Sequence, residues 1–204
     1  MIAIDSSLRR FAAALPSSLA ALILMTACPF AIPAQDHHTQ TATAAADDTA
    51  LDQQSNEQTL LKVVRDATER FKDVNVAMAA GYALQFGCVT GEDAGAMGLH
   101  YVNADLVNSA TLDPTRPQIV IYEPVPGGGL RLIGADFLLL ADPWNASHMG
   151  PPQLMGQLFH LFPAPNRFGL PAFYTLHVWA WKQNPKGAFV NWHPNVSCQS
   201  FVSK

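Results

Sequence analysis

Residues 173–182 read FYTLHVWAWK, and this stretch decides the fold. Successive side chains of a β-strand point to opposite faces, so the stretch separates into two sets. One set is mainly aliphatic and suits a face packed beneath helices: Tyr174, Leu176, Val178 and Ala180. The other set combines aromatic rings with polar tips: Phe173, Thr175, His177, Trp179 and Trp181. The stretch therefore predicts a strand with one face in the core and the other, which bears His177, towards a pocket.

Other β-rich runs precede and follow this strand, and proline and glycine clusters separate them; they cover residues 97–103, 117–125, 130–140 and 187–197. Upstream, apolar residues at helical spacing predict a helix that begins near Ser55 and ends near Asp73, followed by a short helix over 74–82. The fold class is therefore α+β, with N-terminal helices on one face of an antiparallel sheet of about five strands.

The segment over 141–172 is a proline-rich insert between two of the expected strands. Loops of this length in a compact domain usually serve a function. We expect a short helix near 153–162 within it, and we expect the insert to act as a lid over the second face of the sheet.

The N-terminus predicts export. Residues 1–27 have a basic start and an apolar run, which are typical of a secretory signal peptide. The sequence MTAC ending at Cys28 resembles a bacterial lipobox, and cleavage near Ala34 without lipidation is the alternative. The expected location is the periplasm, or the outer membrane as a lipoprotein, with membrane attachment only through a lipidated Cys28.

Composition divides the rest of the chain. Residues 28–56 are rich in Ala, Thr, Gln and Asp without apolar periodicity, which predicts a flexible linker. Residues 57–204 then form a single globular α+β domain. The formal net charge is −4 with scattered basic residues, so no nucleic-acid partner is expected.

Two cysteines, Cys88 and Cys198, remain beyond Cys28. In an oxidising compartment such a pair predicts a disulfide across about 110 residues. A pair of thiolates on a metal ion is the alternative.

Five histidines lie on separate segments of the domain, namely His100, His148, His160, His177 and His193. A lone histidine among aromatic residues is commonly a structural residue bonded to a carbonyl. Several imidazoles with a carboxylate also suffice to bind Zn, Cu or Fe and leave a position open. The candidate metal ligands are His100, His177, His160 and Glu123.

The candidate catalytic residues are His177, His100 and Glu123. Glu123 ends an apolar run and is either a salt-bridge partner or a base whose pKa is raised. Asp136, inside LIGADFLLL, has the same two interpretations, because an unpaired carboxylate there would be costly. We expect His148 in a loop and His193 in a turn.

The segments GAMGLHYVN (residues 95–103) and LHVWAWKQNPKGAFVNWHPNVSC (residues 176–198) together resemble a group of exported bacterial proteins without an assigned activity. The resemblance covers about residues 75–198. It implies a shared fold and a shared pocket, and it assigns no catalytic residue.

Two functions are consistent with these observations. The first is an exported pocket protein that acts on a small apolar or aromatic compound, by metal-dependent chemistry or by acid and base catalysis. The second is a non-enzymatic envelope protein that binds a hydrophobic ligand or a protein partner.

Overall fold

The computed structural model describes the backbone of residues 39–202 and the side chains of residues 48–202. The predicted signal peptide, the lipobox at Cys28 and the first part of the predicted linker lie outside the described residues. Within residues 39–202, none of the helices combines the length and the apolar character that a membrane crossing requires.

The first helix is longer than its apolar pattern predicts. α1 covers Thr39–Thr68, so it begins well before the predicted start near Ser55 and runs through residues 39–56, which composition predicts to be a linker. Ala, Gln and Leu favour a helix even where no apolar face marks it. Side chains 48–56 are exposed, and packing against the domain begins near Leu60 and Val64, which are fully buried.

A break at Asp73 follows, as the sequence predicts. A short 3-10 helix (Glu69–Lys72) ends there, and Asp73 caps α2 (Val74–Ala79) by accepting a 2.9 Å hydrogen bond from the backbone N–H of Asn75. An Asp at this position satisfies a backbone donor that has no partner within the helix.

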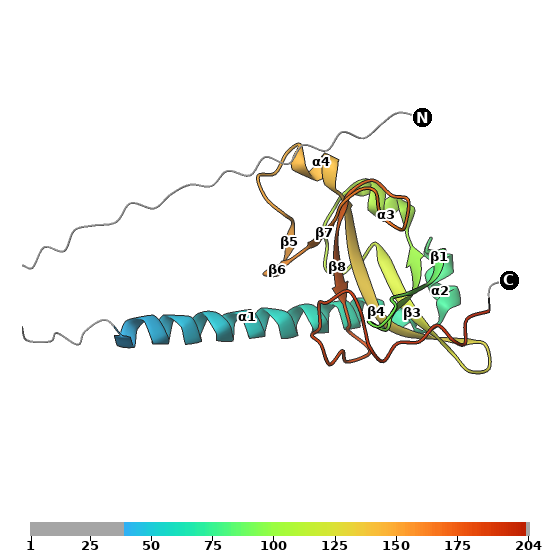
Figure 1. The fold of residues 1–204 in the computed structure, drawn as a ribbon, viewed down its shortest axis with the longest axis horizontal. Coiled ribbons are helices and arrows are strands. Elements are labelled where there is room, and N and C mark those ends of the chain that lie inside the picture. The colour runs from blue at the N-terminus through green and yellow to red at the C-terminus, as the bar shows by residue number, and fades with distance from the viewer. Residues whose placement is uncertain (1–38, 203–204) are drawn as a thin grey trace, which may run out of the picture. The chain divides into compact units, whose positions relative to one another are not determined.

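Six strands form one antiparallel sheet (Figure 1). In their order across the sheet they are β1 (Ala83–Thr90), β2 (Ala96–Val102), β3 (Ile119–Val125), β4 (Gly129–Leu140), β8 (Phe173–Val178) and β7 (His160–Phe162). A separate pair consists of β5 (Gln153–Leu154) and β6 (Gln157–Leu158). The remaining helices are α3 (Ala104–Ser109) and α4 (Ala141–Asn145).

The α+β class and the antiparallel sheet are confirmed, but the sheet has six strands instead of about five. The strand expected over 187–197 is absent, and only an isolated bridge between Ala96 and His193 lies there. β1 was not predicted.

The helix expected near 153–162 is also wrong, because this segment forms β5, β6 and β7. Met155 and Gly156 both have positive φ, 49° and 81°, at the two-residue turn between β5 and β6. This conformation is that of a tight hairpin and cannot continue a helix.

One face of the sheet packs against the helices. Leu60 and Val64 of α1 form a buried cluster with the aliphatic set of β8, as predicted. A neighbouring cluster surrounds Phe71, where Tyr122 donates a 2.6 Å hydrogen bond from its hydroxyl to the Phe71 carbonyl.

Trp181 belongs to this helix-covered side and not to the pocket side. Its indole N–H donates to Thr68 Oγ1 at 2.9 Å, and the Lys72 ammonium lies 4.3 Å from its ring centroid. The strand ends at Val178, so the alternation that placed Trp181 opposite Ala180 no longer holds there.

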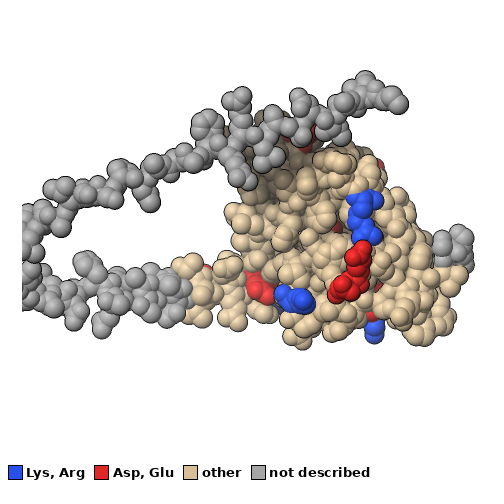
Figure 2. Space-filling view, in the orientation of Figure 1, with Lys and Arg blue, Asp and Glu red and all other residues tan. Residues whose placement is uncertain are grey.

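The predicted disulfide between Cys88 and Cys198 is present, with the two Cα atoms 5.8 Å apart. It joins β1 to the C-terminal segment and leaves neither thiolate for a metal. The surface seen in Figure 2 carries basic and acidic side chains next to one another, without an extended patch of one sign.

Candidate metal centre

The candidate site lies on the face of the sheet opposite α1, where three polar side chains converge from three strands. Asp136 of β4 and His177 of β8 are direct partners in the sheet, so their side chains share a face. His100 lies on β2, two strands away from β4. In a flat sheet the three strand spacings from β2 to β8 would separate His100 from His177 by roughly 14 Å.

The sheet is curled, and the curl brings these residues together. His100 Nε2 lies 3.4 Å from His177 Nε2. A bulge on β4 contributes, because the pairing with β3 passes from Gly134 to Leu132 and leaves Ile133 unpaired. Such a bulge bends its strand and increases the local twist.

Gly98 allows the close approach of β2 to β3. Its φ is +93°, and a Cβ atom at this position would lie 2.6 Å from the Tyr122 carbonyl oxygen. The small-residue run before His100 therefore makes room for a neighbouring backbone.

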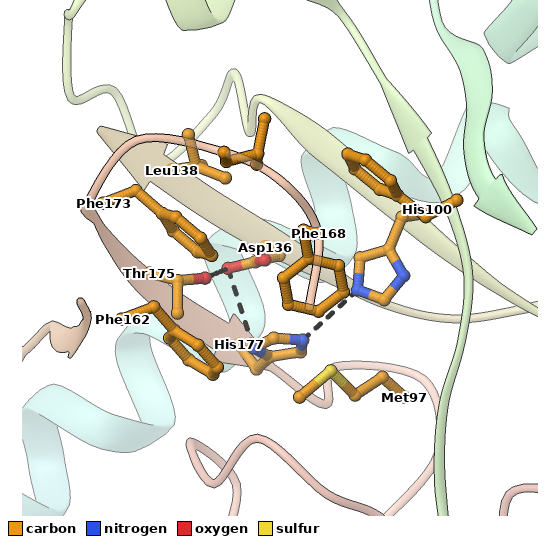
Figure 3. Close-up of a pocket in the computed structure, with 11 residues that line it drawn as sticks. Met97, His100, Asp136, Leu138, Phe162, Phe168, Phe173, Thr175 and His177 are labelled. Carbon is orange, nitrogen blue, oxygen red and sulfur yellow. Dashed lines mark hydrogen bonds and ion pairs between the residues drawn. The ribbon is translucent and has the colours of Figure 1, made fainter. Parts of the chain in front are cut away.

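Figure 3 shows how the polar groups are aligned. Thr175 donates a 2.5 Å hydrogen bond to Asp136 Oδ1, and that oxygen lies 3.8 Å from His177 Nδ1. On the other side of the ring, His177 Nε2 faces His100 Nε2. One ligand atom from each of His100, Asp136 and His177 lies within 4.8 Å of the others.

All three side chains are buried, with exposed fractions of 7% for His100, 2% for Asp136 and 3% for His177. Neither Nδ1 of the two histidines makes a hydrogen bond of normal geometry within the described residues. The amide of Asn191 lies beside His177, and its Oδ1 also lacks such a bond. Unpaired buried polar atoms cost about 1–3 kcal/mol each.

Burial sets the protonation of the site. Loss of hydration lowers the pKa of His100 to about 4 and that of His177 to about 3. Loss of hydration also raises the pKa of Asp136 to about 6, against the hydrogen bond from Thr175. Both imidazoles are therefore neutral at pH 7, which is the form that binds metal ions.

A small cavity adjoins the three residues and has about 30 Å³ of free space. Its wall is mainly apolar and consists of Phe86, Met97, Leu138, Phe162, Phe168, Leu170 and Phe173, together with Thr175 and the three polar residues. Phe168 and Leu170 come from the proline-rich insert.

Glu123, predicted as a ligand with His100 and His177, does not belong to the cluster of His100, Asp136 and His177. Lys182 Nζ lies 2.8 Å from both of its carboxylate oxygens, and an Arg131 guanidinium nitrogen lies 2.6 Å from one of them. Desolvation raises the pKa of Glu123, but hydrogen bonds from Lys182 and Arg131 outweigh it and lower the pKa overall. Glu123 is thus a salt-bridge partner.

His160 also lies outside the cluster. It is on the edge strand β7, opposite Thr175 in the sheet, and its side chain is exposed. It is close enough for its charge to lower the pKa of His177. The residue therefore lies near the three-residue cluster without contributing a ligand to it.

The other two histidines have local roles. His148 is exposed and stacks on Trp144 with ring centroids 3.6 Å apart. His193 is buried, and its ring contacts the Gln183 carbonyl at 3.1 Å and accepts a hydrogen bond from the N–H of Asn195 at 3.1 Å. The second contact stabilises a turn, as the sequence predicts.

Asp136 is a candidate ligand that is not among the four metal ligands predicted from the sequence. Its signal is visible, since it is an acid within the apolar run of β4. The sequence offers no means to rank it above Glu123, because the difference between them lies in their tertiary partners.

Comparison with protein-family models, with curated proteins and with solved structures found no match to this chain.

Proposed function

We propose that the protein binds one divalent transition metal ion through His100, His177 and Asp136, and that the bound ion acts on a small apolar compound in the adjoining cavity. The resemblance to exported bacterial proteins supports only the proposed location of the protein and does not support the metal site.

The observation that carries the proposal is the 3.4 Å separation of the two buried Nε2 atoms. Two nitrogen ligands, each about 2.0–2.1 Å from a tetrahedral ion, lie about 3.3–3.4 Å apart. A direct N–H···N hydrogen bond would normally be shorter. The Nε2–Nε2 distance therefore fits two ligands of one ion better than a direct hydrogen bond between the two imidazoles.

Asp136 supplies the charge that such an ion requires. Its carboxylate is buried, and within the described residues no Lys or Arg forms an ion pair with it. Two imidazoles with one carboxylate are suitable for Zn²⁺, Cu²⁺ and Fe²⁺ and leave coordination positions open. A metal ion in such a site polarises a bound oxygen or activates water.

The remaining residues have supporting roles. Thr175 holds Asp136 by its hydroxyl, which fixes the carboxylate relative to His177. The apolar wall excludes water and thereby strengthens the electrostatic interactions inside the cavity.

The test is the metal content of protein purified without a histidine tag. We expect the chelator-treated protein, dialysed against Zn²⁺, Cu²⁺ or Fe²⁺, to retain one equivalent by elemental analysis. His100→Ala and His177→Ala should each lose it. His148→Ala, which removes an exposed histidine, is the matched control and should retain it. Equal metal content in all four proteins would refute the proposal.

A second candidate is a non-enzymatic protein that holds a hydrophobic ligand or a partner. The apolar character of seven of the eleven lining side chains favours it. It predicts no retained metal, and unchanged ligand binding in His100→Ala and His177→Ala.

We further propose that the protein acts outside the cytoplasm. The Cys88–Cys198 disulfide supports this location, because disulfides persist mainly in oxidising compartments. Cell fractionation with Cys28→Ser tests whether a lipid anchors the protein to the membrane. Recovery of the wild-type protein in the cytoplasm with both thiols reduced would contradict export.

A further inference from the structure

We infer that the cavity accepts only a small uncharged apolar ligand of a few heavy atoms, and that Phe86 sets this size limit. The inference rests on the proposed function, since it specifies what reaches the proposed metal centre.

The size limit follows from the volume of the cavity, about 30 Å³. A single water needs about 10–15 Å³ by a comparable measure, whereas an engineered cavity of about 150 Å³ binds benzene. The cavity therefore has room for one or two small groups and none for an aromatic ring. An aromatic compound, which the sequence leaves open as a substrate, would need one wall to move.

The apolar preference follows from the lining. Phenylalanine rings surround the space, and the polar groups that face it are already assigned to the candidate ion or to one another. A charged ligand entering this wall would lose its hydration without a compensating partner.

Two parts of the aromatic wall are fixed by the sheet. Phe162 of β7 and Phe173 of β8 are direct partners, and their rings stack with centroids 5.1 Å apart. Their backbones are held by the β7–β8 pairing, so this side of the cavity resists displacement.

Phe86 forms a different kind of wall. The pairing of β1 with β2 passes from Gln85 to Cys88, so Phe86 and Gly87 lie in a bulge without partners. Phe86 has a φ of +63° and is half exposed. A bulky residue rarely adopts this conformation, which costs roughly 1–2 kcal/mol.

The ring of Phe86 lies against Phe168 of the insert, with centroids 5.4 Å apart. The two rings come from segments that no strand pairing connects. Separation of this contact would therefore enlarge the cavity without breaking the sheet, and truncation of Phe86 should have the same effect.

The test uses xenon and benzene as probes of the chelator-treated protein, with the methyl group of Met97, which lines the cavity, as the NMR reporter. In the wild type we expect xenon to shift the Met97 signal and benzene to leave it unchanged. In Phe86→Ala we expect both to shift it, with benzene binding tightened by on the order of tenfold or more.

Leu84→Ala is the matched control, because Leu84 lies on the same strand, is partly exposed and does not line the cavity. Phe168→Ala is the second variant, and it should behave as Phe86→Ala does. The inference is overturned if benzene binds the wild type and Phe86→Ala equally, or if neither probe moves the Met97 signal in any variant. Because no metal is required, this result is independent of the elemental analysis that tests the proposed function.

Discussion

Two buried acids on neighbouring strands have opposite surroundings. Glu123 of β3 is 5% exposed and Asp136 of β4 is 2% exposed. Glu123 contacts Lys182, Arg131 and the backbone N–H of Ser197. Asp136 accepts a side-chain hydrogen bond from Thr175, and the nearest ring nitrogen, His177 Nδ1, is 3.8 Å away.

The difference shows which acid is available for chemistry. The positive charges around Glu123 lower its pKa, whereas burial raises the pKa of Asp136 to about 6. A carboxylate that is already neutralised by Lys182 contributes to the fold and offers little to a metal ion. Asp136 carries a charge that the described residues leave uncompensated, and a cation between the two histidines would supply the compensation.

The largest expected effect comes from Lys182→Met. Removal of this ammonium leaves Glu123 buried with the exposed Arg131 and the Ser197 N–H as its partners, so the free energy of unfolding should fall by about 2–3 kcal/mol. Urea denaturation measures this change, with Lys186→Met, an exposed lysine, as the control. Metal content should stay at one equivalent. A loss of metal in Lys182→Met would mean that the two acids are not independent.

Asp136→Asn should have the opposite effect. The amide removes an uncompensated buried charge and can still accept a hydrogen bond from Thr175. The metal-free protein should therefore become more stable at pH 7.5 by about 1–2 kcal/mol. The variant should lose the increase in Tm that metal ions give the wild type. Asp93→Asn, an exposed substitution, should change neither. A destabilised Asp136→Asn protein with normal metal binding would contradict this account of the charge.

The two acids should also differ in their pH dependence. The pKa of Asp136 in the folded protein, about 6, lies above its unfolded value of about 3.9, so its charge destabilises the fold at neutral pH and this cost disappears as pH falls from 6 to 4. The pKa of Glu123 is lowered on folding, so its contribution is present above its unfolded pKa and is lost as pH falls below about 4.3.

Denaturation of metal-free protein at pH 7, 5.5, 4 and 3 measures these differences. The stability advantage of Asp136→Asn over the wild type should shrink between pH 6 and 4, and the deficit of Glu123→Gln should shrink only below that range. The two buried histidines, His100 and His177, change the stability in the opposite direction to Asp136 as the pH falls. Their folded pKa values of about 4 and 3 lie below the unfolded value of about 6.5, so stability falls as pH drops through this window. Parallel curves for the two acid variants would refute the assignment.

The smallest effect concerns Phe86, which lines the cavity from the bulge on β1. At the positive φ of Phe86, glycine is less strained than alanine, so Phe86→Gly should be more stable than Phe86→Ala by about 0.5–1 kcal/mol. Thermal denaturation of the two variants measures the difference. If alanine were the more stable of the two, the bulge would not hold this conformation in solution.

The sequence predicts the central strands because their alternation is regular. The two faces of β8 separate as expected, with Tyr174 and Leu176 towards α1 and Thr175 and His177 towards the cavity. β1 was missed because the bulge at Phe86 and Gly87 interrupts the alternation. The sequence predicts a helix near 153–162 instead of strands because a turn with two positive φ values is not evident from apolar spacing.

The site could be predicted only in part. His100 and His177 are identified by residue type and by strand face, but their proximity depends on the curl of the sheet. The sequence does not separate Glu123 from Asp136, because Lys182, which neutralises Glu123, lies 59 residues away in the sequence. Only the tertiary structure shows which acid has a cationic partner.

The most direct test of the central claim is the anomalous diffraction of crystals of the protein loaded with Zn²⁺. We expect a single strong peak about 2.0–2.1 Å from both His100 Nε2 and His177 Nε2. A peak at Glu123 or at His160, or two vacant imidazoles in fully loaded crystals, would contradict it.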